Sequence, residues 1–459
     1  EAGQDLCQHP LRLCAGLAPH DGCFPTPFQI GRLYFMRLST YYLSTILLIT
    51  TFCLPAKGTG FRIPPYIQNP STDRMSILWF SNDNTPGLLT YRRKDADTPT
   101  TINSIPVRAD ALAYPVWEDT TYFAGQAPPP PFRHRVRLDG LEPATTYAYE
   151  VVQDTSRFDA IFTTAPTAEK PIRFIAYADC ETEPESTGKH TKWISPERSS
   201  TATGNTYLLD QTTGYAQNLA VIAARQPDFI AIAGDLVETG GEQRDWDEFW
   251  RHNTHADGRQ SIAGRRPIFA APGNHEYYEG PRKGYKQPDS ERAITRFRTY
   301  FESPDNQADD RRQKGRYYRV DYGPVTLIAL DVANNSPHQS KRDTNFMLVG
   351  EKDSEGGRAP AFGPGSRQYA WLEEQLADAQ HKSKFTFVFF HHVPYSVGPH
   401  GKPPGPPDDD HDNQSGVPVR VLTPLFMRYG VDAVLAGHDE IWERSEIAGV
   451  EIASGKQRA

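Results

Sequence analysis

The chain has 459 residues, of which 38% are hydrophobic and 23% are charged, and its formal net charge is −8. This is the balance of a globular protein with room for two or three domains of about 150 residues each. The negative net charge and the lack of a dense run of Lys and Arg argue against a nucleic-acid-binding surface.

The N-terminal residues have the pattern of an export signal. Residues 1–35 precede the first Met, and we interpret them as a leader that is not part of the native protein. Residues 36–58 start with a basic residue, Arg37, continue with the apolar run 43–54 and end in small residues, which is typical of a secretory signal peptide. The apolar run is too short to span a bilayer, which takes about 20 residues. We therefore expect a secreted or periplasmic protein with no stable membrane span; an uncleaved anchor and an ordinary buried segment remain the alternatives.

Residues 59–166 have the pattern of a small all-β domain. The segments 76–80 and 88–93 are strand-like and are separated by a turn rich in Asn, Asp, Pro and Gly. In 134–152, alternating apolar residues lead through a Gly-containing turn to Tyr147 and a second alternating run. This pattern predicts two strands joined across the corner of a β-sandwich, with a tyrosine that bonds back to the backbone. We expect this domain to serve packing or to shape a cleft; binding to a carbohydrate or a surface is the alternative.

From residue 170 onward, short apolar segments alternate with helix-like segments. Near-continuous apolar strands indicate a sheet that is covered on both faces, and sites in such α/β folds lie in the loops that follow the strands. We expect the segments 182–204 and 394–417 to border the cleft. Strands are predicted at 172–179, 229–235, 268–275, 325–331, 385–392 and 433–439, and helices at 206–225 and 366–380.

Five of these strands end in a side chain that can bind a metal ion. They are Asp179, Asp235, Asn274, His391 and His438. Taken singly, each is better explained as a turn cap or a buried polar residue. Their occurrence in order, three of them beside a glycine that allows a sharp turn, predicts one shared metal site. A second histidine directly follows His391, and because neighbours in a strand point to opposite faces, only one of the two is expected to face the site.

The motifs resemble those of a known family. GDLVE (234–238), GNHE (273–276), a strand that ends in His, and GHDE (437–440) followed by ERS resemble the calcineurin-like metallophosphoesterases. Together with the preceding β domain, they are most similar to the purple acid phosphatase branch. The resemblance implies an α/β domain with four layers (α/β/β/α) over 170–459, preceded by a fibronectin III-like all-β sandwich over 59–166.

The resemblance also implies a role for each site residue. Asp235 would bridge two metal ions, Asp179 would hold the first ion, and Asn274, His391 and His438 would hold the second. The catalytic residues would be Asp235 and the histidine after Asn274. That residue, His275, would face the substrate and stabilise or protonate the leaving group. A carboxylate can bridge two cations, and two cations about 3.5–4 Å apart clamp phosphate oxygens and lower the pKa of a bound water.

The residues around the first metal depart from the family's pattern. Asp179 is followed by Cys180 and Glu181, Glu440 stands where the family has a His, and Glu238 stands where purple enzymes have a tyrosine. One hypothesis is that Glu440, with Glu181 or Glu238, supplies oxygen ligands, which favours a hard cation such as Mn, Mg or Ca over Zn. The other hypothesis is a weakened or empty first site. We expect Cys180 to be a packed thiol rather than a ligand.

We therefore expect a secreted phosphoesterase with two divalent, or mixed-valence, metal ions. It would hydrolyse phosphomonoesters or phosphodiesters by direct attack of a metal-bound hydroxide. The identity of the ions (Mn, Fe, Zn, Mg or Ca), the natural substrate and the oligomeric state stay open. The alternative is a catalytically weakened surface or adhesion protein that keeps the fold. Because the sequence stops soon after the last motif, truncation of the last sheet edge is a further expectation.

Overall fold

The computed structural model describes residues 60–185, 191–193, 207–209, 211–280, 290–337, 339–346 and 359–447. The predicted leader (1–35) and signal peptide (36–58) lie outside the described residues. All that follows concerns the described residues of the unit 55–459. Within the described residues, no helix combines the length and the apolar character needed to cross a bilayer.

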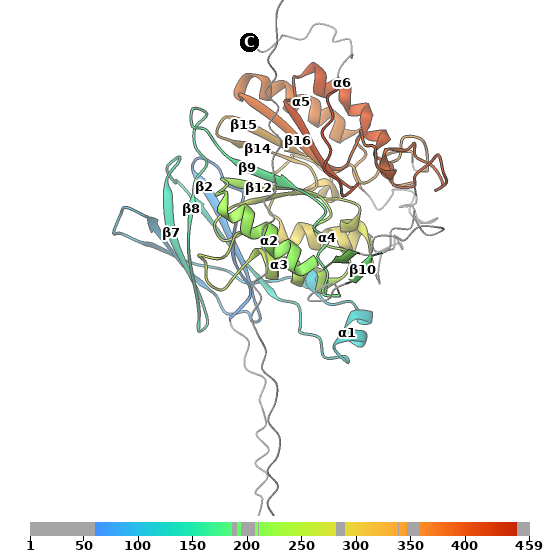
Figure 1. The fold of residues 1–459 in the computed structure, drawn as a ribbon. Coiled ribbons are helices and arrows are strands. Elements are labelled where there is room, and N and C mark those ends of the chain that lie inside the picture. Colours follow the sequence, from blue (N-terminus) through green and yellow to red (C-terminus); the bar gives the residue numbers. More distant parts are fainter. Residues whose placement is uncertain are drawn as a thin grey trace, which may run out of the picture. The chain divides into compact units, whose positions relative to one another are not determined.

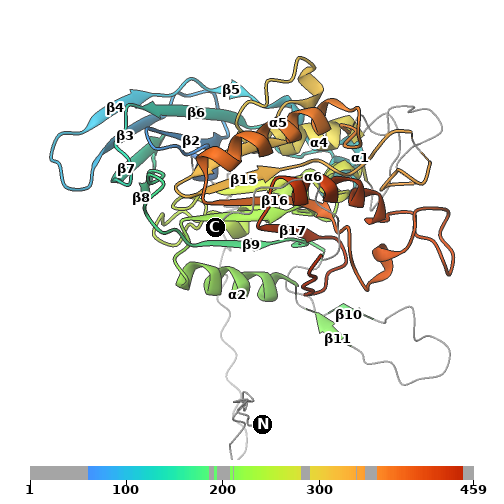
Figure 2. The same cartoon turned by 90° about the horizontal axis from the view of Figure 1, so that it is seen from above.

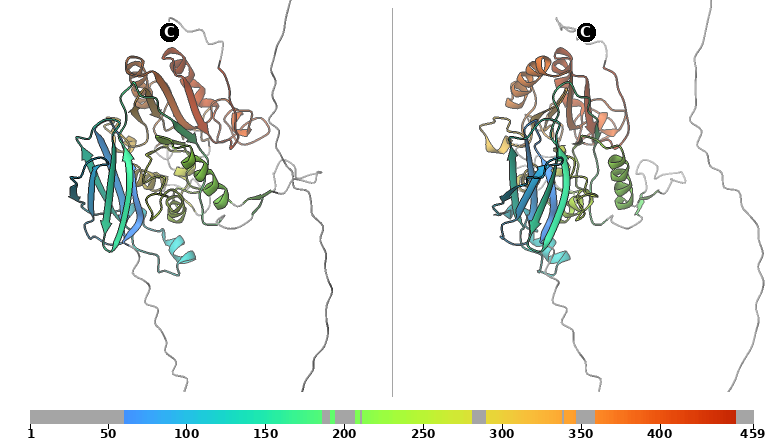
Figure 3. Two further views of the ribbon diagram at one scale, coloured as in Figure 1. Left: turned by 60° about the vertical axis from the view of Figure 1, so that its left-hand side comes forward. Right: turned by 90° about the vertical axis from the view of Figure 1, so that its left-hand side faces the viewer.

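A β-sandwich forms the first part of this unit (Figure 3). One antiparallel sheet has the order β1-β2-β6-β5 and the other the order β4-β3-β7-β8. Inward-facing side chains of both sheets, among them Trp79, Val136 and Phe162, form one hydrophobic core. The strands are β1 (Phe61–Gln68), β2 (Arg74–Ser81), β3 (Leu88–Arg93), β4 (Thr100–Asn103), β5 (Val107–Arg108), β6 (Phe132–Asp139), β7 (Thr146–Gln153) and β8 (Ser156–Thr163).

The predicted corner of the sandwich is confirmed. β6 belongs to one sheet and β7 to the other, and the turn between them carries the chain across the core. The hydroxyl of Tyr147 accepts a hydrogen bond from the backbone N–H of Glu142 at 2.9 Å, as expected for a tyrosine at this corner. The two strands predicted at 76–80 and 88–93 are also present, as β2 and β3.

A short helical insert leaves the sandwich between β5 and β6. It contains the 3₁₀ helix η1 (Asp110–Leu112) and helix α1 (Val116–Tyr122). Glu118 of α1 is fully buried and accepts hydrogen bonds from the backbone N–H groups of Gln243 and Arg244 at 2.9 and 3.0 Å. The insert thus contacts the α/β domain directly.

The α/β domain contains two sheets packed face to face (Figure 1). The first is parallel, in the order β13 (Ile268–Ala271), β12 (Phe229–Ala233), β9 (Phe174–Tyr177). The second has the order β14 (Tyr318–Tyr322), β15 (Val325–Ala329), β16 (Phe385–His392), β17 (Ala433–Gly437), with only β14 antiparallel. Their facing side chains, such as Phe229, Ala231, Leu327 and Phe389, form one buried cluster.

Helices cover the outer face of each sheet, so the domain has the four layers predicted (Figure 2). Buried residues of α2 (Gln211–Ala224), α3 (Gln243–Asn253) and α4 (Ser290–Tyr300) pack with Ile230 and Ile232 of the first sheet. Buried residues of α5 (Arg367–Lys382) and α6 (Thr423–Arg428) pack with Ile328 and Val388 of the second. The remaining short elements are β10 (Thr191–Trp193), β11 (Tyr207–Leu209), η3 (His275–Tyr277), η4 (Arg311–Gln313), η6 (Pro399–Gly401) and η7 (Val417–Leu422).

All six strands predicted for the α/β domain are present, and the helix predicted at 366–380 is α5. Ser366 caps it, because its hydroxyl accepts a hydrogen bond from the N–H of Tyr369. The prediction of a helix at 206–225 was wrong for its first turn. Residues 207–209 form β11, which pairs with β10, and α2 begins at Gln211.

The sandwich and the α/β domain share a hydrophobic core. Tyr66 and Phe80 of the sandwich are fully buried in the same cluster as Trp250 and Tyr300. The rings of Tyr66 and Trp250 have centroids 4.3 Å apart, and the hydroxyl of Tyr66 donates to the carbonyl of Tyr300 at 2.8 Å. The two parts therefore stabilise each other.

Candidate metal centre

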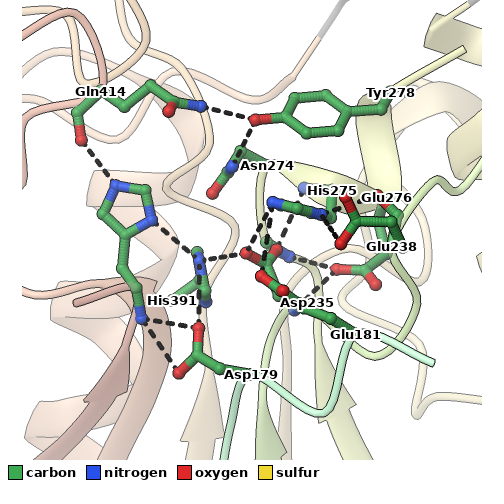
Figure 4. Close-up of polar contacts among 12 residues, drawn as sticks. Asp179, Glu181, Asp235, Glu238, Asn274, His275, Glu276, Tyr278, His391 and Gln414 are labelled. Carbon is green, nitrogen blue, oxygen red and sulfur yellow. Dashed lines mark hydrogen bonds and ion pairs between the residues drawn. The ribbon is translucent and has the colours of Figure 1, made fainter. Parts of the chain in front are cut away.

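Four of the five predicted metal-binding residues lie together at one edge of the two sheets (Figure 4), and the fifth, His438, forms a cluster with Asp235 and His391. The first three follow strands of the first sheet: Asp179 after β9, Asp235 after β12 and Asn274 after β13. The other two come from the second sheet, His391 near the end of β16 and His438 directly after β17. Because the carboxyl ends of these parallel strands share an edge, residues far apart in sequence become neighbours.

A histidine cluster, defined as Asp235, His391 and His438, forms one half of the site. All three are buried, and each offers one ligand atom within 4.8 Å of the others. Nε2 of His391 lies 2.8 Å from Oδ2 of Asp235 and 3.0 Å from Nδ1 of His438. Nδ1 of His391 lies 2.9 Å from the carbonyl oxygen of Ala233, so it donates its proton there and leaves Nε2 for the site.

A carboxylate cluster, defined as Asp179, Glu181 and Asp235, forms the other half and meets the same 4.8 Å limit. Asp179 is fixed by the main-chain N–H of His438, which lies 2.9 and 3.1 Å from its two carboxylate oxygens. Asp235 belongs to both clusters. Its carboxylate is therefore placed to contact a cation in either half.

A third group within the same limit consists of Glu181, Glu238 and His275. Nδ1 of His275 lies 2.7 Å from the carbonyl oxygen of Glu238, and its Nε2 lies 3.5 Å from Oε1 of Glu181 and 3.7 Å from Oδ2 of Asp235. Because a carbonyl oxygen can only accept, Nδ1 carries a proton and Nε2 faces the carboxylates. His275 thus lies beside the predicted metal ligands.

Asn274 is the remaining predicted ligand, and its side chain is oriented so that its oxygen can bind a cation. Its side-chain nitrogen donates to the hydroxyl of Tyr278 at 2.9 Å. Its side-chain oxygen is buried and accepts no hydrogen bond from the described residues. A buried acceptor without a partner is costly, and coordination of a cation would satisfy it. With the carboxylate and imidazole donors around it, the site fits divalent metal ions.

Glycines beside the ligands allow the close approach of the two sheets. A Cβ at Gly234 would lie 2.6 Å from the Cβ of His391, and one at Gly273 would lie 2.1 Å from Oδ1 of Asp235. Gly437 makes an equally close approach to another site carboxylate. The glycines noted in the sequence are therefore required by the space available between the site residues.

Three of the five predicted metal-binding residues have backbone angles in the left-handed region. The φ angles are 55° for Asp179, 51° for Asp235 and 84° for His438. Such conformations cost about 1–3 kcal/mol each in non-glycine residues and are concentrated at functional sites. At each of these strand ends the turn aims a side chain into the site instead of continuing the strand.

Glu276 supports the site from behind, a role that the sequence did not reveal. It is fully buried, and its carboxylate accepts hydrogen bonds from the backbone N–H groups of Asp235, Leu236 and Gly273 at 3.0, 2.9 and 2.7 Å. It therefore joins the loops after β12 and β13. Its place in the GNHE motif was visible, but nothing in the sequence showed what it would hold.

His391 and His392 do not simply point to opposite faces. The ring centroids of both lie close to that of His438, at 4.8 and 4.3 Å. The pairing of β16 with β17 is irregular between Phe389 and His392, so regular strand alternation does not hold there. His391 is the one that joins the histidine cluster, while Nε2 of His392 lies 3.4 Å from Nδ2 of Asn345.

Cys180 and Glu440, which the sequence analysis considered as metal ligands, lie at the margin of the site. Cys180 is buried in the hydrophobic core, with its thiol 3.4 Å from the carbonyl oxygen of Leu236. Glu440 is exposed and belongs to none of the three groups found among the described residues. Glu181 and Glu238 are thus the acidic replacements that the structure brings together with His275.

The segment 394–417 contacts the site through His400, which the sequence did not single out. The ring of His400 stacks on that of His438 with centroids 3.8 Å apart. Its Nδ1 lies 2.7 Å from Oδ2 of Asp412, and its main-chain N–H donates to Asp439 at 3.1 Å. The expectation that this segment borders the site agrees with these contacts.

The electrostatics favour positive charge at the centre. Burial raises the pKa of Asp179 to about 6, and burial together with Asp235 and Glu238 raises that of Glu181 well above its usual range. Burial works in the same direction on Asp235, but His275 and His391 outweigh it and hold its pKa low. Carboxylates crowded in this way are stabilised by bound cations.

Comparison with known proteins agrees with this geometry. The family model described as "Calcineurin-like phosphoesterase" matches residues 209–440, just over half of the 459 residues. The chain belongs to the calcineurin-like phosphoesterase family. The model described as "Purple acid Phosphatase, N-terminal domain" matches residues 62–166, which contain the β-sandwich. A fibronectin III-like character of this sandwich stays a prediction.

Two curated relatives are uncharacterized proteins of Mycobacterium tuberculosis, Rv2577 of strain ATCC 25618 / H37Rv and MT2654 of strain CDC 1551 / Oshkosh. Each is 28% identical to this chain over 322 residues, which cover 68% of this chain and 50% of the relative. The chain thus spans about half the length of the curated relatives it matches.

Two solved structures share the fold. Purple acid phosphatase PPD1 from yellow lupin (Lupinus luteus) seeds has a TM-score of 0.52 and 19% identity, and the match covers 82% of this chain and 57% of that one. PhoD has a TM-score of 0.50 and 13% identity, with 83% of this chain and 72% of that one covered. Both likenesses support the architecture of an α/β domain preceded by a β-sandwich.

Proposed function

We propose that the chain is a metal-dependent phosphoric ester hydrolase that uses two divalent cations and acts on phosphomonoesters or phosphodiesters. The observation that carries this proposal is the position of Asp235, whose carboxylate belongs to both the histidine cluster and the carboxylate cluster. One carboxylate shared by two sets of ligands could help to hold two cations close together, as in two-metal hydrolysis of phosphoesters.

In this proposal, the two cations held by these residues would supply Lewis-acid stabilisation of phosphate oxygens and would lower the pKa of a water molecule for use as the nucleophile. The ligands are Asp179, Glu181 and Asp235 on one side, with Asn274, His391 and His438 completing the other. No protein nucleophile and no phosphoenzyme are needed.

His275 has the geometry of a proton donor to the leaving group. Its Nδ1 is held by the carbonyl of Glu238 at 2.7 Å, which fixes the ring and directs Nε2 toward the carboxylates. Nε2 lies 3.5 Å from Oε1 of Glu181 and 3.7 Å from Oδ2 of Asp235, and from this position it would pass a proton to the leaving oxygen. Without that proton, the alkoxide leaving group would depart with its full charge.

The donor set favours a hard cation in the half of the site that contains Asp179. The donors in this half are the carboxylate oxygens of Asp179, Glu181 and Asp235, and Glu238 lies next to Glu181. Oxygen-rich sites suit Mn²⁺, Mg²⁺ or Ca²⁺, whereas imidazole nitrogens suit Zn²⁺ and Fe. We propose that this half takes Mn²⁺ or Mg²⁺ in preference to Zn²⁺.

The proposal is tested with p-nitrophenyl phosphate and its bis-ester, using metal-free protein loaded with Mn²⁺, Mg²⁺, Ca²⁺, Zn²⁺ or Fe²⁺. We expect Asp235→Asn to lower kcat by more than the ~10–100-fold that loss of an outer hydrogen-bond partner of a metal site costs. Asp139→Asn, which changes an exposed carboxylate of the sandwich, is the matched control and should not alter the rate.

Absence of turnover by the wild type with every metal and both esters, in protein that is folded and binds cations, would overturn the proposal. It would instead support the alternative of a surface protein that keeps the fold without the activity. Preference for one of the two esters decides between phosphatase and phosphodiesterase activity.

We further propose that residues 36–58 direct export and are removed. The basic start, short apolar run and small residues at the end support this proposal. The test is expression of the full chain in a bacterial host, cell fractionation and N-terminal sequencing of the product. A product that remains in the cytoplasm and begins before residue 36 would contradict it.

A further inference from the structure

Tyr278 contacts three parts of the site at once. Its hydroxyl accepts hydrogen bonds from Nδ2 of Asn274 at 2.9 Å and from Nε2 of Gln414 at 2.7 Å (Figure 4). Its ring lies against that of His275, with centroids 4.4 Å apart. The side chain is only 5% exposed, so these contacts are made away from solvent.

The contact with Tyr278 fixes which end of the Asn274 amide faces the centre. With the NH₂ group bound to the tyrosine hydroxyl, the amide oxygen points away from it, where it is buried and has no partner among the described residues. Rotation of the amide by 180° would present an NH₂ group to the centre, and that group cannot bind a cation. The Tyr278 hydroxyl, which accepts from both Asn274 and Gln414, therefore favours the orientation of Asn274 that directs its amide oxygen to the centre.

Gln414 connects this arrangement to the other sheet. While its side-chain amide donates to Tyr278, its main-chain carbonyl oxygen lies 2.6 Å from Nε2 of His438. Gln414 thus contacts Tyr278 through its side chain and the ring of His438 through its main chain. Asn274 follows β13 of the first sheet and His438 follows β17 of the second, so the link spans the gap between the sheets.

The segment that carries Gln414 is itself held in place. The N–H of Gly416 donates to the carbonyl of His400 at 2.9 Å, and the N–H of Phe346 donates to that of Asn413 at 2.7 Å. A Cβ at Gly416 would lie 1.7 Å from the carbonyl oxygen of Val393. Gln414 is therefore presented from a backbone packed against the end of β16, not from a free loop.

We propose that Tyr278 and Gln414 are positioning residues, which set the orientation of Asn274 and His438 and thereby the affinity of the cation bound between these two and Asp235. This inference rests on the proposed function only in its assumption that the centre binds cations. Outer hydrogen-bond partners of this kind orient metal ligands, and their loss costs about 10–100-fold in metal affinity.

The test is titration of the metal-free protein with Mn²⁺ in a calorimeter, for the wild type and for Tyr278→Phe. The substitution removes the hydroxyl and keeps the ring against His275. We expect the Kd of one Mn²⁺ to rise about 10–100-fold while the other is unchanged. Because two NH₂ groups lose their acceptor, the metal-free variant should be somewhat less stable than the wild type but fully folded at the temperature of the titration. Tyr395→Phe is the matched control, because the Tyr395 hydroxyl lies 3.2 Å from that of Thr423, and it should leave both affinities unchanged.

A second variant tests the link itself. Gln414→Ala removes the side-chain amide and keeps the main-chain carbonyl beside His438. If the two residues act through their shared hydrogen bond, the double variant Tyr278→Phe/Gln414→Ala should bind Mn²⁺ no more weakly than the single variant with the lower affinity. Saturating Mn²⁺ should restore the hydrolysis rate of each variant.

Equal Mn²⁺ affinity in the wild type and Tyr278→Phe would overturn the inference, as would an equal loss at both cation positions or a loss explained by partial unfolding of the metal-free variant at the temperature of the titration. A wild-type protein that binds no cation would instead overturn the proposed function. The two failures are therefore distinguishable.

Discussion

At the scale of single residues, the protein contains a buried histidine far from the metal centre that makes stability depend on pH. His134 of β6 is fully buried and stacks on Trp79 with ring centroids 4.9 Å apart. Its two nitrogens lie 2.8 Å from the hydroxyls of Ser81 and Ser104. Burial lowers the pKa of His134 to about 4.

Because this pKa is lower in the folded protein than in the unfolded chain, the unfolded chain takes up the proton first as the pH falls. We expect the contribution of His134 to be fully present above pH 6.5 and to be lost as the pH falls toward 4, by about 3 kcal/mol at most. Urea unfolding at several pH values should show a steeper loss in the wild type than in His134→Gln. Parallel curves for the two proteins would contradict this.

The metal-centre residues were predictable because each is a short motif at the end of an apolar strand. Asp235, Asn274 and His438 stand beside glycines, and the structure brings all three to the same edge. Their partners were not predictable, because Tyr278 and Gln414 are 136 positions apart and no local pattern marks either. The sequence also left open whether Glu440 replaces a usual ligand of the first metal. The exposure of Glu440 depends on the path of the chain after β17.

At the scale of elements, helix α3 is capped by a side chain from another domain. Its own N-cap residue, Glu242, makes no side-chain cap, and the carboxylate of Glu118 in α1 binds the N–H groups of Gln243 and Arg244 instead. A carboxylate at a helix N-terminus satisfies free N–H groups and interacts well with the helix dipole.

We expect Glu118→Ala to lower the free energy of unfolding by about 1–2 kcal/mol, because two buried N–H groups lose their acceptor. Glu374→Ala, which changes an exposed glutamate of α5, is the control and should change it little. Equal unfolding midpoints for the two variants in a denaturant titration would show that water replaces the missing carboxylate at no cost.

The elements differ in how well the sequence revealed them. Strands β12, β15 and β16 are continuous apolar runs, and α5 begins with a serine cap and carries apolar residues at helical spacing. The segments that form α3 and α4 are rich in charged residues, and their aromatic side chains are buried against each other, the first sheet and the sandwich. Such tertiary contacts override local preference, so these two helices were not predicted.

At the scale of the whole molecule, the shared core predicts cooperative unfolding. Tyr66 and Phe80 of the sandwich are buried against Trp250 and Tyr300 of the α/β domain, and removal of either part would expose large aromatic surfaces to water. We expect residues 60–447 to give a single transition in a calorimetric scan. Two transitions, with one matching the α/β domain expressed alone, would contradict this.

The convergence of the two sheets at a common edge also bears on folding itself. A cation bound by Asp235 and Asn274 on one side and by His391 and His438 on the other would act as a cross-link between two halves of the domain, in addition to their apolar contacts and the hydrogen bonds between them. Any cation with higher affinity for the folded state stabilises it in proportion to the logarithm of its free concentration, by about 2.7 kcal/mol at 100 times its Kd. A low concentration of metal ions would therefore lower the stability of the folded protein as well as its proposed activity.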